Sequence, residues 1–261
     1  MTGAAYDADG TGCQDAFAVH AADEFVVAAV SDGLSSSARS GEGARWAVDA
    51  AVDSVRRCLE SADAVSASAS CGTIAITALL DSRAFVLEKA RLAGGEPAEF
   101  ASTLLVAVAT VRGFGYAQVG DGAIVVLAGD GSYRMLPRKE SDFVNITVTL
   151  TSRTCEGKVS FGDLEDRPRF AALFTDGLEP AVLKRSSGAD APVPFERFFS
   201  GIRSNFRKCR DDQDVAAFEV AYKAWLEEKE FREKYTDDDV TLVVLANIVD
   251  DTRVEEAGGR G

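Results

Sequence analysis

Aspartate followed by glycine recurs where apolar segments end. Asp32-Gly33 follows FVVAAVS, Asp121-Gly122 follows YAQVG, Asp130-Gly131 follows VVLAG and Asp176-Gly177 follows FAALFT. A carboxylate at a strand end, followed by a residue without a side chain, can project into a shared cleft while a neighbouring carbonyl stays free to bind a cation. Asp-Gly is also the common hairpin dipeptide, and for Asp130 we favour that simpler interpretation. The flanks of Asp32 and Asp176, SDGLSSSARSGEGA and LFTDGLEP, are richer than a turn requires.

The cysteine and histidine content limits the chemistry further. Five cysteines are scattered through the chain without a C-x-x-C pair, as is typical of reduced, incidental thiols: Cys13, Cys58, Cys71, Cys155 and Cys209. A structural zinc site needs about four clustered Cys or His ligands, and His20 is the only histidine. A metal ion must therefore be held by carboxylates, which favours Mg²⁺ or Mn²⁺. We interpret His20, at the end of an apolar run, as structural, so a histidine general base is disfavoured.

The overall composition is that of an acidic globular protein. The 261 residues carry 28 Lys+Arg against 42 Asp+Glu, a net charge of −14, and 46% of them are hydrophobic. The negative charge argues against nucleic-acid binding, which needs a basic surface. The start, MTGAAYDADG, lacks the basic and apolar regions of a signal peptide, and no stretch reaches the ~18 apolar residues that span a membrane. We expect a cytoplasmic protein without a nucleic-acid or membrane partner.

Apolar periodicity predicts a hairpin followed by two helices. Residues 16–20 and 25–31 are β-type runs separated by a short acidic segment. Apolar residues at three- and four-residue spacing predict helices over 42–59 and from about 73 to 93, and Gly94-Gly95 would end the second helix.

The remainder of the chain reads as strands with one helical insert. Expected strands lie at 102–111, 113–120, 123–129, 145–151, 169–177 and 239–249, and we expect the first three to be antiparallel neighbours. The insert before the last strand has an apolar face made of Val215, Phe218, Tyr222, Trp225 and Leu226. Without a repeat or a Pro-rich linker, one domain over residues 1–249 is simplest, and we expect residues 250–261 to be a disordered tail.

Six short elements follow one another along the chain. They are CQDAF at 13–17, VSDGLSSSARSGEGA at 30–44, ASTLLVAV at 101–108, VGDGAIVV at 119–126, LFTDGLEP at 173–180 and DDDVTLVVL at 237–245. Each is weak alone, but together and in this order they resemble the metal-dependent protein phosphatase 2C family, most closely its short bacterial branch. The resemblance implies an α+β fold, an αββα sandwich of two antiparallel β-sheets flanked by helix pairs, with the metal centre at one end.

The resemblance also implies roles for individual residues. Asp15, Asp32, Asp176 and Asp238 would be the catalytic aspartates. Asp32 would bridge two Mn²⁺ or Mg²⁺ ions, and the carbonyl of Gly33 would bind one of them. Asp176 and Asp238 would complete the other ion's site, and Asp15 would hold metal-bound water. Two cations would provide a bridging hydroxide near neutral pH and neutralise the phosphoryl oxygens during in-line attack.

This chain departs from the better-studied members of the family near the expected phosphate site. Leu34 stands where many members have a histidine, so proton delivery would fall to metal-bound water. The segment DGTGC before the first acidic motif offers no phosphate-binding arginine, and Arg39 or Arg45 could substitute, of which we name Arg39 as the candidate. Asp121 resembles the ligand of a third, weaker ion, but Pro180 stands where a second carboxylate would help. Two ions are therefore favoured over three.

Two other motifs begin at Asp7. The run from Asp7 to Thr11 matches the D-x-D-G-T signature of haloacid-dehalogenase-type phosphatases, but the preceding MTGAAY is too short to be the buried strand which that site requires. The same residues begin like an EF-hand loop, whose twelfth position would be Ala18 rather than a bidentate glutamate. We disfavour both interpretations.

We therefore expect a metal-dependent serine/threonine protein phosphatase that hydrolyses phosphomonoesters. Its partner would be a phosphoserine or phosphothreonine protein, such as a cognate kinase or the target of that kinase. The alternative is a catalytically weak member of the same fold that acts as a regulatory or phosphoprotein-binding module. The missing arginine favours this alternative. Retention of Asp32, Asp176 and Asp238 argues against it, because these carboxylates would repel one another without bound cations.

Overall fold

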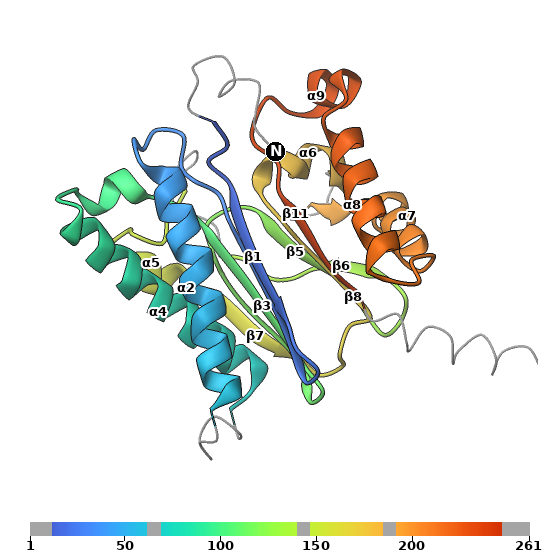
Figure 1. Ribbon diagram of the computed structural model, residues 1–261, viewed down its shortest axis with the longest axis horizontal. Coiled ribbons are helices and arrows are strands. Elements are labelled where there is room, and N and C mark those ends of the chain that lie inside the picture. The colour runs from blue at the N-terminus through green and yellow to red at the C-terminus, as the bar shows by residue number, and fades with distance from the viewer. Residues whose placement is uncertain (1–11, 62–68, 140–146, 185–191, 247–261) are drawn as a thin grey trace, which may run out of the picture.

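Two antiparallel sheets form the centre of the computed structural model, which describes residues 12–61, 69–139, 147–184 and 192–246 (Figure 1). The first sheet has the order β1-β2-β3-β4-β7, with β1 at Ala16–Ala21, β2 at Phe25–Ser31, β3 at Leu104–Thr110, β4 at Gly113–Val119 and β7 at Ser160–Leu164. The second sheet has the order β11-β8-β5-β6, with β5 at Ala123–Leu127, β6 at Tyr133–Met135, β8 at Phe170–Phe174 and β11 at Leu242–Ala246. A third, two-stranded sheet pairs β9 at Leu183–Lys184 with β10 at Val193–Pro194.

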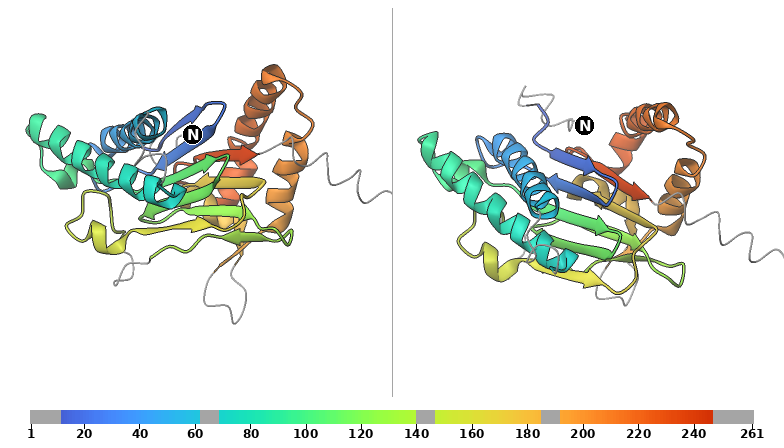
Figure 2. Two further views of the ribbon diagram at one scale, coloured as in Figure 1. Left: turned by 90° about the horizontal axis from the view of Figure 1, so that it is seen from below. Right: turned by 60° about the horizontal axis from the view of Figure 1, so that its bottom comes forward.

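Helices cover the outer face of each sheet, as the two views of Figure 2 show. Helices α2 (Ser40–Glu60) and α4 (Cys71–Leu92) pack on the first sheet. Helices α7 (Glu196–Phe206), α8 (Asp212–Leu226) and α9 (Lys229–Tyr235) pack on the second. Shorter helical segments are η1 (Pro97–Phe100), α5 (Cys155–Lys158), η2 (Asp176–Leu178) and α6 (Glu179–Val182). The order helix, sheet, sheet, helix is the expected αββα sandwich.

The alternation of side chains along β3 shows how one strand serves two cores. Leu104, Val106 and Val108 are buried against α2 and α4. The intervening residues, Leu105 and Ala107, are buried between the two sheets. Side chains alternate across a strand, so a strand that is apolar at every position is buried on both faces.

The predicted hairpin and the two predicted helices are confirmed. Strands β1 and β2 pair antiparallel, with Ala16 opposite Ser31. Helix α2 buries apolar residues at the expected spacing, among them Ala44, Val48 and Val55. Helix α4 ends at Leu92, and Gly94 after it has a φ of 68°. This is the left-handed conformation that glycine adopts without steric cost.

The prediction that residues 113–120 and 123–129 are antiparallel neighbours is wrong. Strand β4 belongs to the first sheet, whereas β5 pairs with β6 and β8 in the second. The chain crosses between the sheets at Asp121, where Gly120 and Gly122 have φ values of 94° and 82°. Local sequence indicates a turn at this point but does not indicate which sheet the next strand joins.

The predicted strand at 145–151 is also wrong for its described part, residues 147–151. There the backbone groups bond outside any ladder, because Leu150 donates its N–H to the Ser102 carbonyl at 2.7 Å and accepts from Arg83. The prediction missed strands β6 and β7, which are short or contain Gly and Asp. The predicted end of the last strand, 247–249, and the tail at 250–261 lie outside the described residues. Within the described ranges, no helix is long and apolar enough to cross a membrane.

Candidate metal centre

The register of the strands brings five aspartates to one end of the sandwich. In the first sheet, β1 begins after Asp15 and pairs antiparallel with β2, which ends before Asp32, so these two residues share an end. In the second sheet, β8 ends before Asp176 and β11 begins after Asp238, and these strands are also antiparallel neighbours. Asp121 lies in the turn that joins the two sheets, between β4 and β5.

Three of these carboxylates form a compact group. One carboxylate oxygen from each of Asp32, Asp121 and Asp176 lies within 4.8 Å of the others, and all three side chains are half-buried. The backbone of Asp32 is fixed on both sides, because its N–H donates to Thr103 Oγ1 at 2.9 Å and its carbonyl accepts from the Thr103 N–H at 2.8 Å. The Asp121 carboxylate accepts a hydrogen bond from Thr147 Oγ1 at 2.7 Å.

Asp15, which directly precedes β1, lies beside Asp32 of this group. Its Oδ2 accepts a hydrogen bond from Thr175 Oγ1 at 2.8 Å, and Thr175 directly precedes Asp176. Its Oδ1 is buried, and no N–H or O–H donor of the described residues reaches it. A buried carboxylate oxygen without a donor is costly unless a cation or an ordered water meets it. Asp15 is therefore suited to a site that contains one or the other.

The electrostatics of the group are unfavourable without a cation. Burial raises the pKa of Asp32, and repulsion from Asp15 and Asp176 raises it further. The pKa of Asp176 is likewise raised, first by burial and then by Asp121 and Asp238. Burial raises the pKa of Asp15 as well. Carboxylates that crowd together in a partly dry site hold protons unless positive charge is supplied.

The three consecutive aspartates before β11 differ in their surroundings. Asp239 is only 2% exposed, and its Oδ2 accepts the backbone N–H of Gln14 at 2.6 Å. Asp238 is half-buried, and burial raises its pKa, with Asp121 among the further contributors. Asp238 is not one of the three residues of the compact group, although its charge interacts with those of Asp121 and Asp176. Asp239 joins the segment before β11 to the segment that leads into β1.

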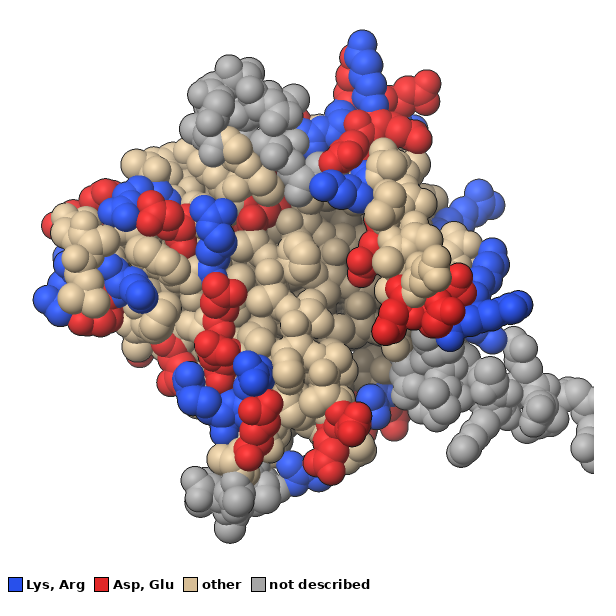
Figure 3. All heavy atoms as spheres, viewed as in Figure 1, with Lys and Arg blue, Asp and Glu red and all other residues tan. Residues whose placement is uncertain are grey.

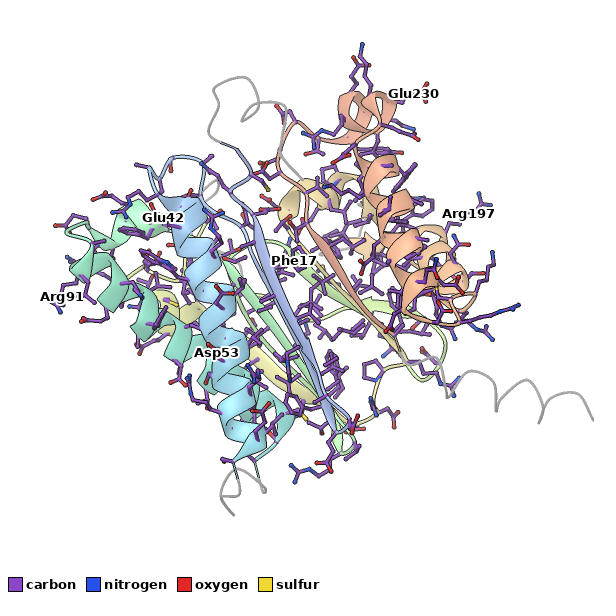
Figure 4. All side chains as sticks on the ribbon, in the orientation of Figure 1. Phe17, Glu42, Asp53, Arg91, Arg197 and Glu230 are labelled. Carbon is purple, nitrogen blue, oxygen red and sulfur yellow. The ribbon has the colours of Figure 1, made fainter. Side chains whose placement is uncertain are left out.

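Of the two candidate phosphate-binding arginines, Arg39 directly precedes α2 and Arg45 lies in its first turns. Arg39 forms an ion pair with Glu42, with Nε–Oε1 at 2.8 Å, and its guanidinium stacks on Phe100 at 4.4 Å from the ring centre. Figure 4 shows Glu42 at the end of α2 that is near the strand ends. Arg45 is exposed on the same helix.

The surroundings of His20 and Asp130 agree with the structural role and the hairpin turn expected for them. His20 lies 3.7 Å from Glu60 and packs against Phe25 with ring centres 5.6 Å apart, which fits a structural residue. Asp130 accepts hydrogen bonds from the N–H and hydroxyl of Ser132 and pairs with Arg134, as in an ordinary hairpin turn between β5 and β6. The Asp7 to Thr11 motif lies outside the described residues.

Sequence reasoning did not identify the residues that support the aspartates. Thr103 and Thr175 each lie inside a motif that carries the resemblance, but their hydrogen bonds to Asp32 and Asp15 join positions far apart in the sequence. Arg138 and Glu179 form an ion pair beside the Asp121 turn, across 41 positions of sequence. No local pattern marks such a pair.

The donor set fits a hard divalent cation. The converging atoms are carboxylate oxygens of Asp32, Asp121 and Asp176, and such oxygens are the ligands that Mg²⁺ and Mn²⁺ prefer. A Cβ on Gly33 would lie 2.9 Å from the Gln14 carbonyl oxygen, so a larger residue would disturb this loop.

Comparisons with known proteins agree with this geometry. A family model described as "Protein phosphatase 2C" matches residues 2–228. The chain is 24% identical over 221 residues to serine/threonine-protein phosphatase 3 of Escherichia coli K12, covering 82% of this chain and 81% of that protein.

Solved structures share the fold at low sequence identity. A sex-determining protein of C. elegans matches with a TM-score of 0.61 and 15% identity, over 94% of this chain and 62% of that one. A bacterial serine phosphatase in which one arginine is replaced by alanine matches with a TM-score of 0.54 and 15% identity, over 90% and 91% of the two chains. PppA of Pseudomonas aeruginosa matches with a TM-score of 0.51 and 18% identity, over 89% and 96%.

Proposed function

The chain belongs to the protein phosphatase 2C family, and from this premise we propose that its carboxylate centre hydrolyses phosphoserine and phosphothreonine in proteins. The activity is that of a metal-dependent serine/threonine protein phosphatase. The observation that carries the proposal is the convergence of Asp32, Asp121 and Asp176, with one oxygen of each within 4.8 Å of the others. Such a group has no evident structural purpose, because like charges at this spacing destabilise the fold.

We propose distinct roles for the surrounding residues. Asp32 and the Gly33 carbonyl would hold two ions, with Asp176 and Asp238 completing the coordination of one of them. When bound, Mg²⁺ or Mn²⁺ would lower the pKa of coordinated water and neutralise charge on the phosphoryl oxygens. Asp15, whose Oδ1 has no donor among the described residues, would orient water through that oxygen. The threonine hydroxyl at 175 fixes the other oxygen and so sets the direction of the carboxylate.

Two further proposals concern a third ion at Asp121 and the residue that binds the phosphate. Asp121 lies within the compact group, so it can contribute to the same centre, and Pro180 offers no further ligand. Arg39 already has Glu42 as a partner and Phe100 beneath it. To bind a phosphate, the guanidinium would have to exchange the Glu42 carboxylate for the substrate, which is feasible because both side chains are partly exposed.

The proposed substrate class is based on the family to which the chain belongs, not on a substrate-binding groove in the structure. We propose that phosphoproteins are the substrates and that a cognate kinase, or the target of that kinase, is the partner. The alternative of a catalytically weak regulatory or phosphoprotein-binding module is favoured by the missing phosphate-binding arginine before the first acidic motif. The first Asp-Gly loop also departs from the family pattern. Leu34 occupies the position after the first Asp-Gly pair, so this loop supplies no proton donor there.

A direct test is the release of phosphate from phosphoserine and phosphothreonine peptides. We expect hydrolysis with added Mn²⁺ or Mg²⁺ and none with excess EDTA, because oxygen-ligand sites exchange these ions readily. Asp32→Ala should remove turnover, whereas Asp130→Ala, in the hairpin turn of β5 and β6, should not. Full activity in EDTA would refute the proposal. Phosphopeptide binding without hydrolysis, at any concentration of either ion, would favour the regulatory alternative.

A further inference from the structure

A largely buried ion pair joins the two turns that carry Asp121 and Asp176. Arg138 follows strand β6, and its Nη1 pairs with the Glu179 carboxylate while its Nη2 lies 3.4 Å from Glu179 Oε2. The two side chains are only 16% and 20% exposed. Withdrawing both charges from water is costly, so a pair of this kind adds little net stability over apolar residues. Stability therefore does not explain why this ion pair lies between the two turns.

The same guanidinium also holds the Asp121 turn. Arg138 Nη1 donates to the carbonyl oxygen of Gly122 at 2.7 Å, and Gly122 directly follows Asp121. A Cβ on Gly122 would lie 2.7 Å from the Phe174 carbonyl oxygen, so this turn rests against the end of β8. The positive φ of Gly122 and this close approach leave little freedom for the peptide that Arg138 holds.

Glu179 connects the guanidinium to the other turn. The backbone N–H of Glu179 donates to the Asp176 carbonyl, and this bond closes the short helical turn of η2 that begins at Asp176. A continuous path therefore leads from Gly122 through Arg138 and Glu179 to Asp176. The planar guanidinium can serve two acceptors at once in a fixed relative direction, which a lysine ammonium cannot do.

We propose that Arg138 is a positioning residue which, through Gly122 and Glu179, holds Asp121 and Asp176 at the spacing at which their carboxylates share a divalent cation. The inference rests on the proposed metal-dependent function. The charges of Arg138 and Glu179 cancel each other. The pair therefore does not neutralise the aspartates, whose negative charge attracts the cation. When a residue that positions a metal ligand is replaced, metal affinity or activity typically changes by 10–100-fold.

The test is calorimetric titration of the full-length, metal-free protein with Mn²⁺, in the absence of substrate. The double variant R138M/E179Q removes the link but keeps the net charge, and we expect it to bind Mn²⁺ roughly 10–100-fold more weakly. R138K keeps the charge but loses the planar fork, and we expect weakening by at least about threefold. The matched control is R134M/D130N, which removes an exposed ion pair from the neighbouring hairpin and should leave Mn²⁺ affinity unchanged.

A second readout separates positioning from a general loss of stability. The Mn²⁺ concentration for half-maximal phosphatase activity should rise by the factor seen in calorimetry, while kcat at saturating Mn²⁺ should return close to that of the parent protein. If the double variant does not fold, R138K decides. Mn²⁺ affinities of folded R138M/E179Q and R138K within about twofold of the parent would overturn the inference and leave the proposed function standing. A parent protein that binds no Mn²⁺ would overturn both.

Discussion

Asp32 is held in an unfavourable electrostatic position by its own backbone. Thr103 bonds both the N–H and the carbonyl of Asp32, so this residue cannot relax away from Asp15 and Asp176. A residue that is fixed at a cost in stability is typical of functional sites, where removing the charge stabilises the fold and removes the function. Asp176, the first residue of η2, is also held at a cost, because burial and neighbouring carboxylates raise its pKa.

We expect Asp32→Asn and Asp176→Asn to raise the free energy of unfolding of the metal-free protein by roughly 0.5–2 kcal/mol. Both should lose stabilisation by Mn²⁺. Each should also lose at least about a hundredfold in turnover, because a bound cation contributes several kcal/mol to the transition state. Urea denaturation in EDTA and in Mn²⁺, together with phosphopeptide turnover, measures all three effects. A loss of stability in EDTA for both variants would show that these residues are structural.

The three aspartates before β11 allow a second prediction at this scale. Asp238→Asn should require far more Mn²⁺ for activity, because it removes a charge that interacts with Asp121 and Asp176. Asp239→Asn should stay active, since an amide oxygen can still accept the Gln14 N–H, and Asp237→Asn should be near neutral. Activity is measured against Mn²⁺ concentration for all three variants. Should Asp239→Asn be the variant that loses its metal response, the assignment is displaced by one residue.

Two secondary-structure elements meet so closely that only glycine fits between them. Gly115 lies in β4 beneath the start of α4, and a Cβ at this position would lie 2.0 Å from the backbone nitrogen of Gly72 and 2.2 Å from the Cys71 carbonyl carbon. From β7, Asp163 Oδ1 accepts the Gly72 N–H at 2.7 Å. The helix start is therefore fixed against two neighbouring strands of the first sheet.

We expect Gly115→Ala to lower the free energy of unfolding by about 1–3 kcal/mol, since α4 must move away from β4 to admit the methyl group. Gly113→Ala is the matched control on the same strand, because nothing lies within 4 Å of a Cβ there. It should change stability by less than about 0.5 kcal/mol. Urea denaturation of both variants makes the comparison. Equal effects would mean that the helix tolerates displacement at this point.

The elements that sequence predicts well are those whose signal is local. The apolar spacing in α2 and the apolar β-type runs of β1 and β2 are local patterns, so these elements can be predicted directly. The sheet to which β5 belongs depends on its partners β6 and β8, and the irregular path at Leu150 depends on Ser102 and Arg83. The aspartates were found through their motifs, but Arg138 and Glu179 were not, since their pairing exists only in the folded chain.

The whole molecule presents an uncharged strip between two charged flanks. Figure 3 shows charged side chains along α2 and on the α7–α8 side, with uncharged residues at the centre of this face. Phe17 of edge strand β1 is 63% exposed, and Figure 4 shows it between α2 and α8. Three buried clusters, one between the sheets and one beneath each helical layer, support the sandwich. The prediction that residues 1–249 form a single domain stays a prediction.

The stability of the whole molecule should depend on pH in a direction set by the carboxylate group. Burial and neighbouring carboxylates raise the pKa of Asp15 to about 6 and that of Asp176 to about 7, and they also raise that of Asp32. An unfolded aspartate has a pKa of about 3.9. Between these values the folded state binds more protons than the unfolded state, so the free energy of unfolding falls as the pH rises. Exposed carboxylates with lowered pKa values, such as Glu42 and Glu88, lose their contribution only at more acidic pH.

We therefore expect the metal-free protein to be less stable at about pH 8 than at about pH 5.5, opposite to a protein limited by acid-labile ion pairs. Mn²⁺ should reverse this trend, because a cation that binds only the folded state adds about 2.7 kcal/mol at a hundred times its dissociation constant. The gain should be larger at the higher pH, where the aspartates are ionised. Urea denaturation at both pH values, with EDTA or Mn²⁺, gives the four free energies. Asp32→Asn should make the free energy of unfolding depend less on pH, both in EDTA and in Mn²⁺. If the free energy of unfolding in EDTA instead rises steadily to pH 8, the carboxylate group does not control the pH dependence of stability.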